Sequence, residues 1–292
     1  ESFAAKVEAE WAHWKDSPAT VPAEDFARLE GFFTPPAYEQ FAGDDAGFLQ
    51  KQSEDKAFAR WVERNVNKHK VPGYASVTLS LKKTGIPPGD ATDGQMEAVA
   101  DFADRYSFGE VRISHEQNMI LADVKQSELY TLWQAARDIG FATPNIGLLT
   151  DMIVCPGGDF CALANAKSIP VAEAIQRRFD DLDYLYDIGD VDMNFSGCMN
   201  SCGHHHIGNI GILGVDKNGS EWYQVSLGGE QGNKATLGKV IGPSFAQEEM
   251  PDVIEKIINV YIEQRHADER FIDTVRRIGI DPFKERVYAK AH

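Results

Sequence analysis

Cysteine is scarce in this sequence, and long apolar runs and blocks of positive charge are missing. The 292 residues carry 29 lysines and arginines against 45 aspartates and glutamates, so the net charge is −16. Nucleic acids and anionic membranes bind basic patches, which this chain does not offer. No apolar run approaches the roughly 18–20 residues that span a membrane, and no signal-peptide pattern precedes the first expected helix. We therefore expect no nucleic-acid partner, no membrane partner and a cytoplasmic location.

The few cysteines are gathered in one stretch of the chain. They are Cys155, Cys161, Cys198 and Cys202, and there are no others. Unrelated core cysteines would be scattered, whereas soft thiolates gathered in space bind iron–sulfur clusters or zinc. The pattern therefore predicts a metal centre.

The two cysteine pairs differ in the residues between them. A Pro-Gly-Gly sequence follows Cys155 and predicts an irregular loop up to Cys161. Cys198 and Cys202 have the i,i+4 spacing of a helical turn, which would aim both sulfurs the same way. The first gap is longer than the roughly two to four residues that zinc sites prefer. A disulfide needs an oxidising compartment. Both alternatives are weakened but stay open.

These spacings, Cys-x5-Cys and Cys-x3-Cys, resemble those of the siroheme-dependent sulfite and nitrite reductases. The similarity extends from about Val71 to Ile241 and includes the segments VRISHEQN at 111–118 and CGHHHIG at 202–208. In that family four cysteines hold a [4Fe–4S] cluster, and the last one is also the axial ligand of the siroheme iron.

The resemblance implies a role for individual residues. Cys202 would bridge the cluster and the siroheme, and Asn200 matches an asparagine beside the macrocycle. Arg112 would bind a siroheme carboxylate, because arginine binds carboxylates in a fork; an exposed arginine on a sheet face is the alternative. Gln117 is expected to contact the cofactor. The implied cluster ligands are Cys155, Cys161, Cys198 and Cys202.

The sequence predicts an α+β fold. In the segment 71–150, residues 75–81 alternate as in a half-buried strand, and a helix face follows at 96–103. Two more strands and a helix come next, so the order is that of a ferredoxin-like βαββαβ half-unit, which residues 146–150 would complete. A mixed α+β siroheme/iron–sulfur reductase domain is expected at 151–292.

The segment 1–70 is expected to be helical and broken by prolines. One helix is predicted at 56–65, followed by a linker at 67–73. In the last domain, Asn-Gly at 218–219 predicts a β-hairpin. The three histidines at 204–206 are adjacent, so their side chains diverge, and we expect them to donate hydrogen bonds beside the cysteine loop.

The resemblance implies the C-terminal half of an assimilatory sulfite reductase, which reduces sulfite to sulfide with six electrons. An assimilatory nitrite reductase, which forms ammonia, and a plain [4Fe–4S] electron-transfer module are the alternatives. The implied cofactors are a [4Fe–4S] cluster and siroheme. The implied partners are sulfite or nitrite, the missing N-terminal half, and a ferredoxin or flavoprotein as electron donor. Because the cationic substrate site of the family comes largely from the other half, we expect this chain alone to be inactive.

Overall fold

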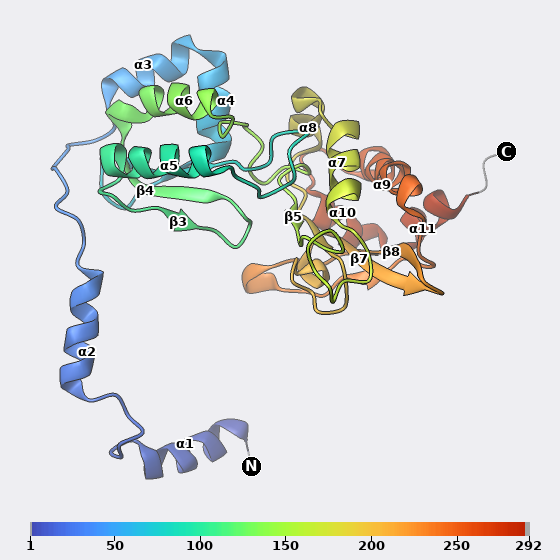
Figure 1. The fold of residues 1–292 in the computed structure, drawn as a ribbon, viewed down its shortest axis with the longest axis horizontal. Helices are drawn as coiled ribbons and strands as arrows, with labels where there is room; N and C mark the ends of the chain where they lie inside the picture. Colours follow the sequence, from blue (N-terminus) through green and yellow to red (C-terminus); the bar gives the residue numbers. More distant parts are fainter. Residues whose placement is uncertain (1, 290–292) are drawn as a thin grey trace. The chain divides into compact units, whose positions relative to one another are not determined.

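The computed structural model describes residues 2–289 (Figure 1). The chain folds into two compact units. The first unit, Glu1–Gln40, consists of short helices, and none of the residues within them is buried. Its elements are α1 (Phe3–Trp14), α2 (Ala23–Glu30) and the 3-10 helix η1 (Gly31–Phe33). The second unit, Phe41–His292, contains both sheets and all four cysteines.

The first half of the second unit is the predicted ferredoxin-like sheet. Its order is β1-β2-β4-β3, with every neighbour antiparallel. The strands are β1 (Val66–Lys68), β2 (Tyr74–Leu79), β3 (Arg112–Ile113) and β4 (Met119–Lys125). The helices are α3 (Ala46–Glu54), α4 (Lys56–Asn65), α5 (Asp93–Tyr106), the 3-10 turn η2 (Gln126–Glu128) and α6 (Leu129–Asp138).

One apolar core joins these helices to one face of the sheet. Trp61 of α4, Leu121 of β4 and Leu132 of α6 are fully buried in it. Helix α4 has the bounds that the sequence predicts, because Asp55 caps its first turn by accepting hydrogen bonds from the backbone of Ala57 and Phe58.

The fourth strand of this sheet comes from a different place than expected. Residues 146–150 form turns and a single bridge, not a strand. The edge beside β2 is instead occupied by β1, which overlaps the start of the linker expected at 67–73. A three-residue strand with two polar residues has no readable alternation, so the linker prediction was wrong at Asn67 and Lys68.

The second half is built on a five-stranded sheet of order β5-β6-β7-β8-β9. β5, β6 and β7 are parallel to one another. β8 is antiparallel to both of its neighbours, β7 and β9. The predicted hairpin joins β7 to β8, with Asn218 and Gly219 both at positive φ. The strands are β5 (Ile153–Val154), β6 (Met193–Ser196), β7 (Ile210–Lys217), β8 (Ser220–Leu227) and β9 (Lys239–Val240).

Helices from both ends of this half bury the sheet in a second core. Phe195 of β6, Ile212 of β7 and Ile257 of α9 are fully buried there. Within residues 2–289, no helix combines the length and apolar character needed to cross a membrane. The helices are α7 (Ile169–Arg178), α8 (Leu182–Ile188), η3 (His205–Ile207), η4 (Gly232–Lys234), η5 (Gln247–Glu249), α9 (Met250–Gln264), α10 (Phe271–Ile278) and α11 (Asp281–Tyr288).

Candidate metal centre

The two cysteine pairs lie at one edge of the second sheet. Cys155 directly follows β5, and Cys198 comes two residues after β6. Because β5 and β6 are parallel, their carboxyl ends meet at the same edge. The backbone N–H of Cys155 donates to the carbonyl of Phe195 at 2.9 Å. Two cysteines 43 positions apart in the numbering are thus brought together by sheet topology.

The loop that carries Cys161 folds back over the loop that carries Cys198. The N–H groups of Asn165 and Ala166 both donate to the carbonyl of Gly197, at 2.9 and 3.1 Å. A Cβ on Gly197 would lie 2.8 Å from the Ala166 carbonyl oxygen, so only glycine permits this approach. Both loops are therefore one backbone-packed unit.

The end of the second loop is just as tight. A Cβ on Gly203 would lie 2.0 Å from the carbonyl oxygen of Phe195 and 3.3 Å from the backbone nitrogen of Cys155. The N–H of Gly203 donates to the hydroxyl of Ser196 at 3.1 Å. This packing holds Cys202 next to the end of β6, beside the other loop.

The four thiols are free and differ in exposure. Cys155 and Cys198 are buried, Cys161 is partly exposed, and Cys202 is exposed. The sulfur of Cys155 accepts N–H bonds from Gly157 at 3.3 Å and Gly197 at 3.4 Å. Such donors stabilise a thiolate and tune the potential of a bound cluster. Two buried sulfurs, one of them with two backbone donors, and one exposed sulfur suit a cluster that is enclosed on one side and open on the other.

The described residues contain no group of three or more His, Cys, Asp and Glu side chains arranged to hold one metal ion. A single tetrahedral ion needs its ligands around one point, whereas a [4Fe–4S] cluster distributes four thiolates around a larger body. Soft sulfur donors, backbone N–H groups aimed at sulfur and glycine-lined loops fit the chemistry of such a cluster.

The loop between Cys198 and Cys202 is a turn, not the helical turn that the spacing suggested. The N–H of Ser201 donates to the Cys198 carbonyl at 3.2 Å, and Ser201 has φ +59°. Its hydroxyl lies 3.2 Å from Nδ1 of His205 and 2.8 Å from Nδ1 of His206. The histidines therefore contact the residue directly before Cys202.

His205 is held as a neutral imidazole. Its side chain is buried, and its ring lies 3.9 Å from that of His206, centroid to centroid. Burial and, to a smaller extent, the neighbouring His206 lower the pKa of His205 to about 4. A neutral ring can both donate and accept a hydrogen bond, which suits its contact with the Ser201 hydroxyl.

The other predicted site residues lie in two places. Asn200 is exposed in the turn between Cys198 and Cys202. Arg112 is an exposed residue of β3 whose side chain forms an ion pair with Glu110. Neither position determines which cofactor group these residues contact, so their cofactor roles stay predictions.

Gln117 lies in the hairpin between β3 and β4 and is used differently. Its side-chain amide forms two hydrogen bonds with the backbone of Val154, both 2.8 Å long. Its contacts therefore lead to the residue before Cys155, and direct contact with a cofactor stays a prediction.

A buried ion pair beside this hairpin was missed by the sequence analysis. Nζ of Lys82 lies 3.3 Å from the Asp151 carboxylate and donates to the carbonyl of Glu116 at 2.6 Å. The side-chain amide of Asn118 donates to the same carboxylate at 2.9 Å. Burial lowers the pKa of Lys82, and the charge of Asp151 opposes that shift. The sequence held one sign of this buried lysine: Lys82 directly follows the strand predicted at 75–81, with its side chain on the face opposite Leu81.

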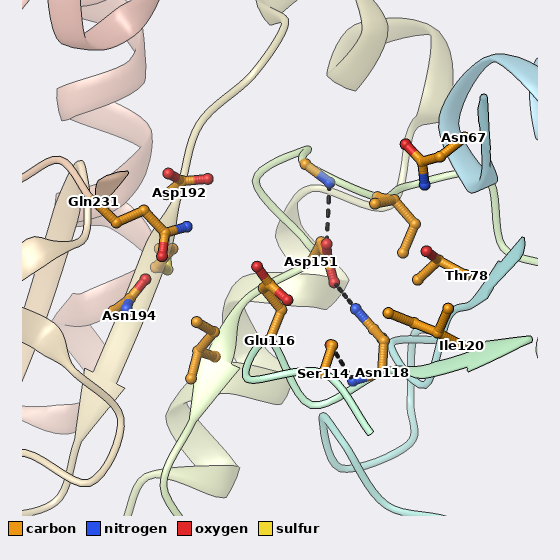
Figure 2. A pocket seen from close by; sticks show the side chains of 14 residues that line it. Asn67, Thr78, Ser114, Glu116, Asn118, Ile120, Asp151, Asp192, Asn194 and Gln231 are labelled. Atoms are coloured by element: carbon orange, nitrogen blue, oxygen red, sulfur yellow. Dashed lines mark hydrogen bonds between the residues drawn. The ribbon is translucent and has the colours of Figure 1, made fainter. Parts of the chain in front are cut away.

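A cavity of about 300 Å³ lies next to this ion pair, between the two sheets (Figure 2). Glu116 and Asp151 reach it from one side and Asp192 from the other. Burial raises the pKa of Asp192, and the nearby carboxylate of Asp151 adds to the effect. Carboxylates and side-chain amides thus line this cavity, and Lys82 pairs with one of the carboxylates, Asp151.

The fold and the site together define a class: an iron–sulfur protein with a ferredoxin-like sheet ahead of a cysteine-bearing sheet. Comparison with known proteins agrees. The model described as the "Nitrite/Sulfite reductase ferredoxin-like half domain" matches residues 74–139, and the "Nitrite and sulphite reductase 4Fe-4S domain" matches residues 148–292. The chain belongs to the nitrite and sulfite reductase family.

Similar curated proteins include both kinds of reductase. A ferredoxin–nitrite reductase of Synechococcus elongatus is 30% identical over 59% of this chain and 34% of its own length. A sulfite reductase [ferredoxin] of Mycobacterium tuberculosis is 26% identical over 73% of this chain and 40% of its own length. The chain thus spans about a third to two fifths of these relatives.

Solved structures show the same fold. The Mycobacterium tuberculosis NirA protein superposes with a TM-score of 0.61 at 25% identity, over 75% of this chain and 41% of that chain. Dissimilatory sulfite reductase I also gives 0.61, at 14% identity, over 75% of this chain and 70% of that chain.

Proposed function

We propose that this chain supplies the cluster-binding part of a siroheme-dependent sulfite reductase. The observation that carries the proposal is the packing of both cysteine loops at one sheet edge, with Cys202 as the exposed thiol. In this proposal Cys155, Cys161 and Cys198 bind the enclosed side of a [4Fe–4S] cluster. Cys202, the exposed thiol, would hold the cluster as well and would also be a ligand of siroheme, with Asn200 next to that cofactor.

The bound cofactors would pass to sulfite the six electrons that reduce it to sulfide, and an external donor would supply those electrons, because side chains cannot do this redox chemistry. The protein would hold and tune them. Gly157 and Gly197 stabilise the Cys155 thiolate through their N–H groups. His205 and His206 fix the Ser201 hydroxyl and with it the turn before Cys202. Arg112 is proposed to bind a siroheme carboxylate.

The ligand assignment is tested by anaerobic reconstitution of the chain with iron and sulfide. The wild-type chain should bind about four iron atoms and four sulfides, and Cys155→Ser should lose most of both. Ser53→Ala, on an exposed position of α3, is the matched control and should bind as the wild type does. Equal iron content in the wild type and Cys155→Ser would refute the assignment.

Sulfite is the proposed substrate because the segment from His204 to Val215 looks more like the bacterial assimilatory sulfite reductase haemoprotein. Nitrite is the second candidate, since a nitrite reductase is 30% identical to this chain. Steady-state assays with both anions, on an enzyme that contains this chain, would distinguish them. A larger kcat/KM for nitrite than for sulfite would reverse the proposed order.

The proposed partners are the other half of the enzyme and a ferredoxin. The helices of the first unit expose large apolar side chains, such as Phe3 at 84% and Phe33 at 82%, and bury none of their residues. We propose that the other half covers them and supplies the cationic substrate site. The names of the relatives favour ferredoxin as the donor. Because this chain carries a net charge of −16, basic residues of the other half would have to dock an acidic ferredoxin.

Without the other half, the chain is expected to bind siroheme poorly and to turn over little sulfite. Adding the other half as a separate polypeptide should restore both. Full reductase activity of the 292-residue chain alone would contradict this part of the proposal.

A further inference from the structure

The hairpin between β3 and β4 reaches across to the strand that leads into the cysteine loop. Gln117 makes the contact. Its Nε2 donates to the carbonyl oxygen of Val154 at 2.8 Å, and its Oε1 accepts from the N–H of Val154 at 2.8 Å. Two bonds of this kind are what a neighbouring strand would provide, because a side-chain amide carries the same donor and acceptor as a peptide group.

This contact lies on the free side of an edge strand. β5 is the first strand of its sheet and, among the residues that the structure describes, pairs with β6 alone. On the β6 side, the N–H of Cys155 donates to the carbonyl of Phe195 at 2.9 Å. On the other side, Gln117 satisfies both backbone groups of Val154. The backbone of Val154 and Cys155 is thus hydrogen-bonded on both sides of the strand, to Gln117 on one side and to Phe195 of β6 on the other.

Gln117 is itself held in an uncommon conformation. Its φ is +60°, a region that non-glycine residues rarely adopt. Its N–H donates to the carbonyl of Ser114 at 3.1 Å, and its Cβ lies against Gly89, where an added Cβ would be 3.1 Å away. A strained backbone that persists because its surroundings fix it is a reason to look for a function.

The neighbours of Gln117 keep the hairpin in place. Asn118 donates to Asp151 at 2.9 Å and accepts from the N–H of Leu81 at 3.1 Å, and Lys82 binds both Asp151 and the carbonyl of Glu116. The hairpin is therefore attached to the end of the first sheet and to the segment before Cys155 at the same time.

We propose that Gln117 is a positioning residue for Cys155: its amide fixes the backbone of β5 so that the Cys155 sulfur is presented to the cluster. This inference rests on the proposed function, in which Cys155 is a cluster ligand. It differs from the direct cofactor contact that the family resemblance implies for Gln117, because it needs no siroheme.

The test compares Gln117→Ala and Gln117→Glu with the wild-type chain after reconstitution with iron and sulfide and without siroheme. The glutamate keeps the acceptor for the Val154 N–H but loses the donor to the Val154 carbonyl. Loss of iron to a chelator should be about tenfold faster in Gln117→Ala, the scale at which partners behind metal ligands act, and intermediate in Gln117→Glu. The electron paramagnetic resonance spectrum of the reduced cluster should change in both.

Gln126→Ala is the matched control. The side-chain amide of Gln126 also makes two hydrogen bonds to a segment far away in the sequence. It accepts from the N–H of Asp45 at 2.7 Å and donates to the Asp44 carboxylate at 2.8 Å, in the ferredoxin-like half. It should leave the chelation rate and the spectrum unchanged. Equal acceleration in Gln117→Ala and Gln126→Ala, or wild-type behaviour in both Gln117 variants, would overturn the proposal.

Hydrogen exchange in the metal-free chain tests the same contact independently. The Val154 amide should exchange at least tenfold faster in Gln117→Ala than in the wild type, while amides of β8 stay unchanged. Unchanged exchange at Val154 would overturn the positioning role. If the wild-type chain bound no cluster, the proposed function would fail, and this measurement would still decide whether Gln117 holds β5.

Discussion

The two halves of the second unit are packed in different ways, one mainly through side chains and the other, at its cysteine edge, through backbone. In the ferredoxin-like half, large side chains such as Trp61 and Leu121 fill a core between helices and one face of the sheet. At the cysteine edge of the other sheet, backbone packs on backbone, and Gly197 and Gly203 leave no room for a methyl group. Side-chain cores relax partly after substitution, whereas backbone contacts of this kind cannot. The first region should therefore respond to mutation gradually and the second abruptly.

The largest effect is expected for Gly203→Ala. The new Cβ would lie 2.0 Å from the carbonyl of Phe195, so β6 and the turn before Gly203 must separate. We expect the variant to fold around its distant core and to retain little or no reconstituted iron, measured as iron and acid-labile sulfide per chain. Gly94→Ala in α5 has nothing within 4 Å of its new Cβ and should retain the wild-type amount. Normal iron binding by Gly203→Ala would mean that the cysteine edge is not rigid.

The junction between the two sheets should give the next largest effect. Lys82→Met removes the cation that faces the buried Asp151 carboxylate, and an uncompensated buried charge costs about 3–5 kcal/mol. The free energy of unfolding, measured in urea, should fall by that amount. Lys83→Met, at the exposed neighbouring position, should change it by less than about 0.5 kcal/mol. If the two variants were equally stable, the ion pair between Lys82 and Asp151 would not contribute to the stability of the fold.

A core substitution in the ferredoxin-like half should destabilise without touching the cluster. Leu121 is fully buried, so Leu121→Ala should cost about 2–5 kcal/mol, with a value that depends on how well the site collapses. Below its lowered melting temperature the variant should bind as much iron as the wild type. Iron loss at a temperature where circular dichroism shows a folded chain would contradict the separation of the two regions.

The sequence was most informative where a residue type is rare or a pattern is long. Four gathered cysteines predicted the metal centre, and the helix predicted at 56–65 is α4 at its observed bounds. Strands of two to four residues, such as β1, β5 and β6, are too short for a periodic pattern. The bond between Gln117 and Val154 joins residues 37 positions apart, and no local signal announces it. The positive φ of Ser201, in the turn between Cys198 and Cys202, likewise has no signal in the local sequence.

The smallest effect should come from the helix cap of α4, on the surface of the ferredoxin-like half. The Asp55 carboxylate accepts N–H bonds from Phe58 and Ala57, and chiefly the Phe58 bond lowers the pKa of Asp55 against the opposing effect of burial. Asp55→Ala should lower the free energy of unfolding by about 1 kcal/mol at pH 7, whereas Asp55→Asn keeps the cap and should lose less.

The pH dependence of these variants follows from the direction of that shift. A carboxyl whose pKa is lower in the folded than in the unfolded chain contributes stability above its ordinary pKa, and this contribution is lost as the pH falls through the folded value. The difference between wild type and Asp55→Asn should therefore shrink as the pH is lowered from 7 to below about 4. Urea unfolding at both pH values, followed by far-ultraviolet circular dichroism, measures it. A difference in unfolding free energy that grew on acidification would show that the neutral form of Asp55 is the better cap. Iron binding at pH 7 should be the same in the wild type, Asp55→Ala and Asp55→Asn.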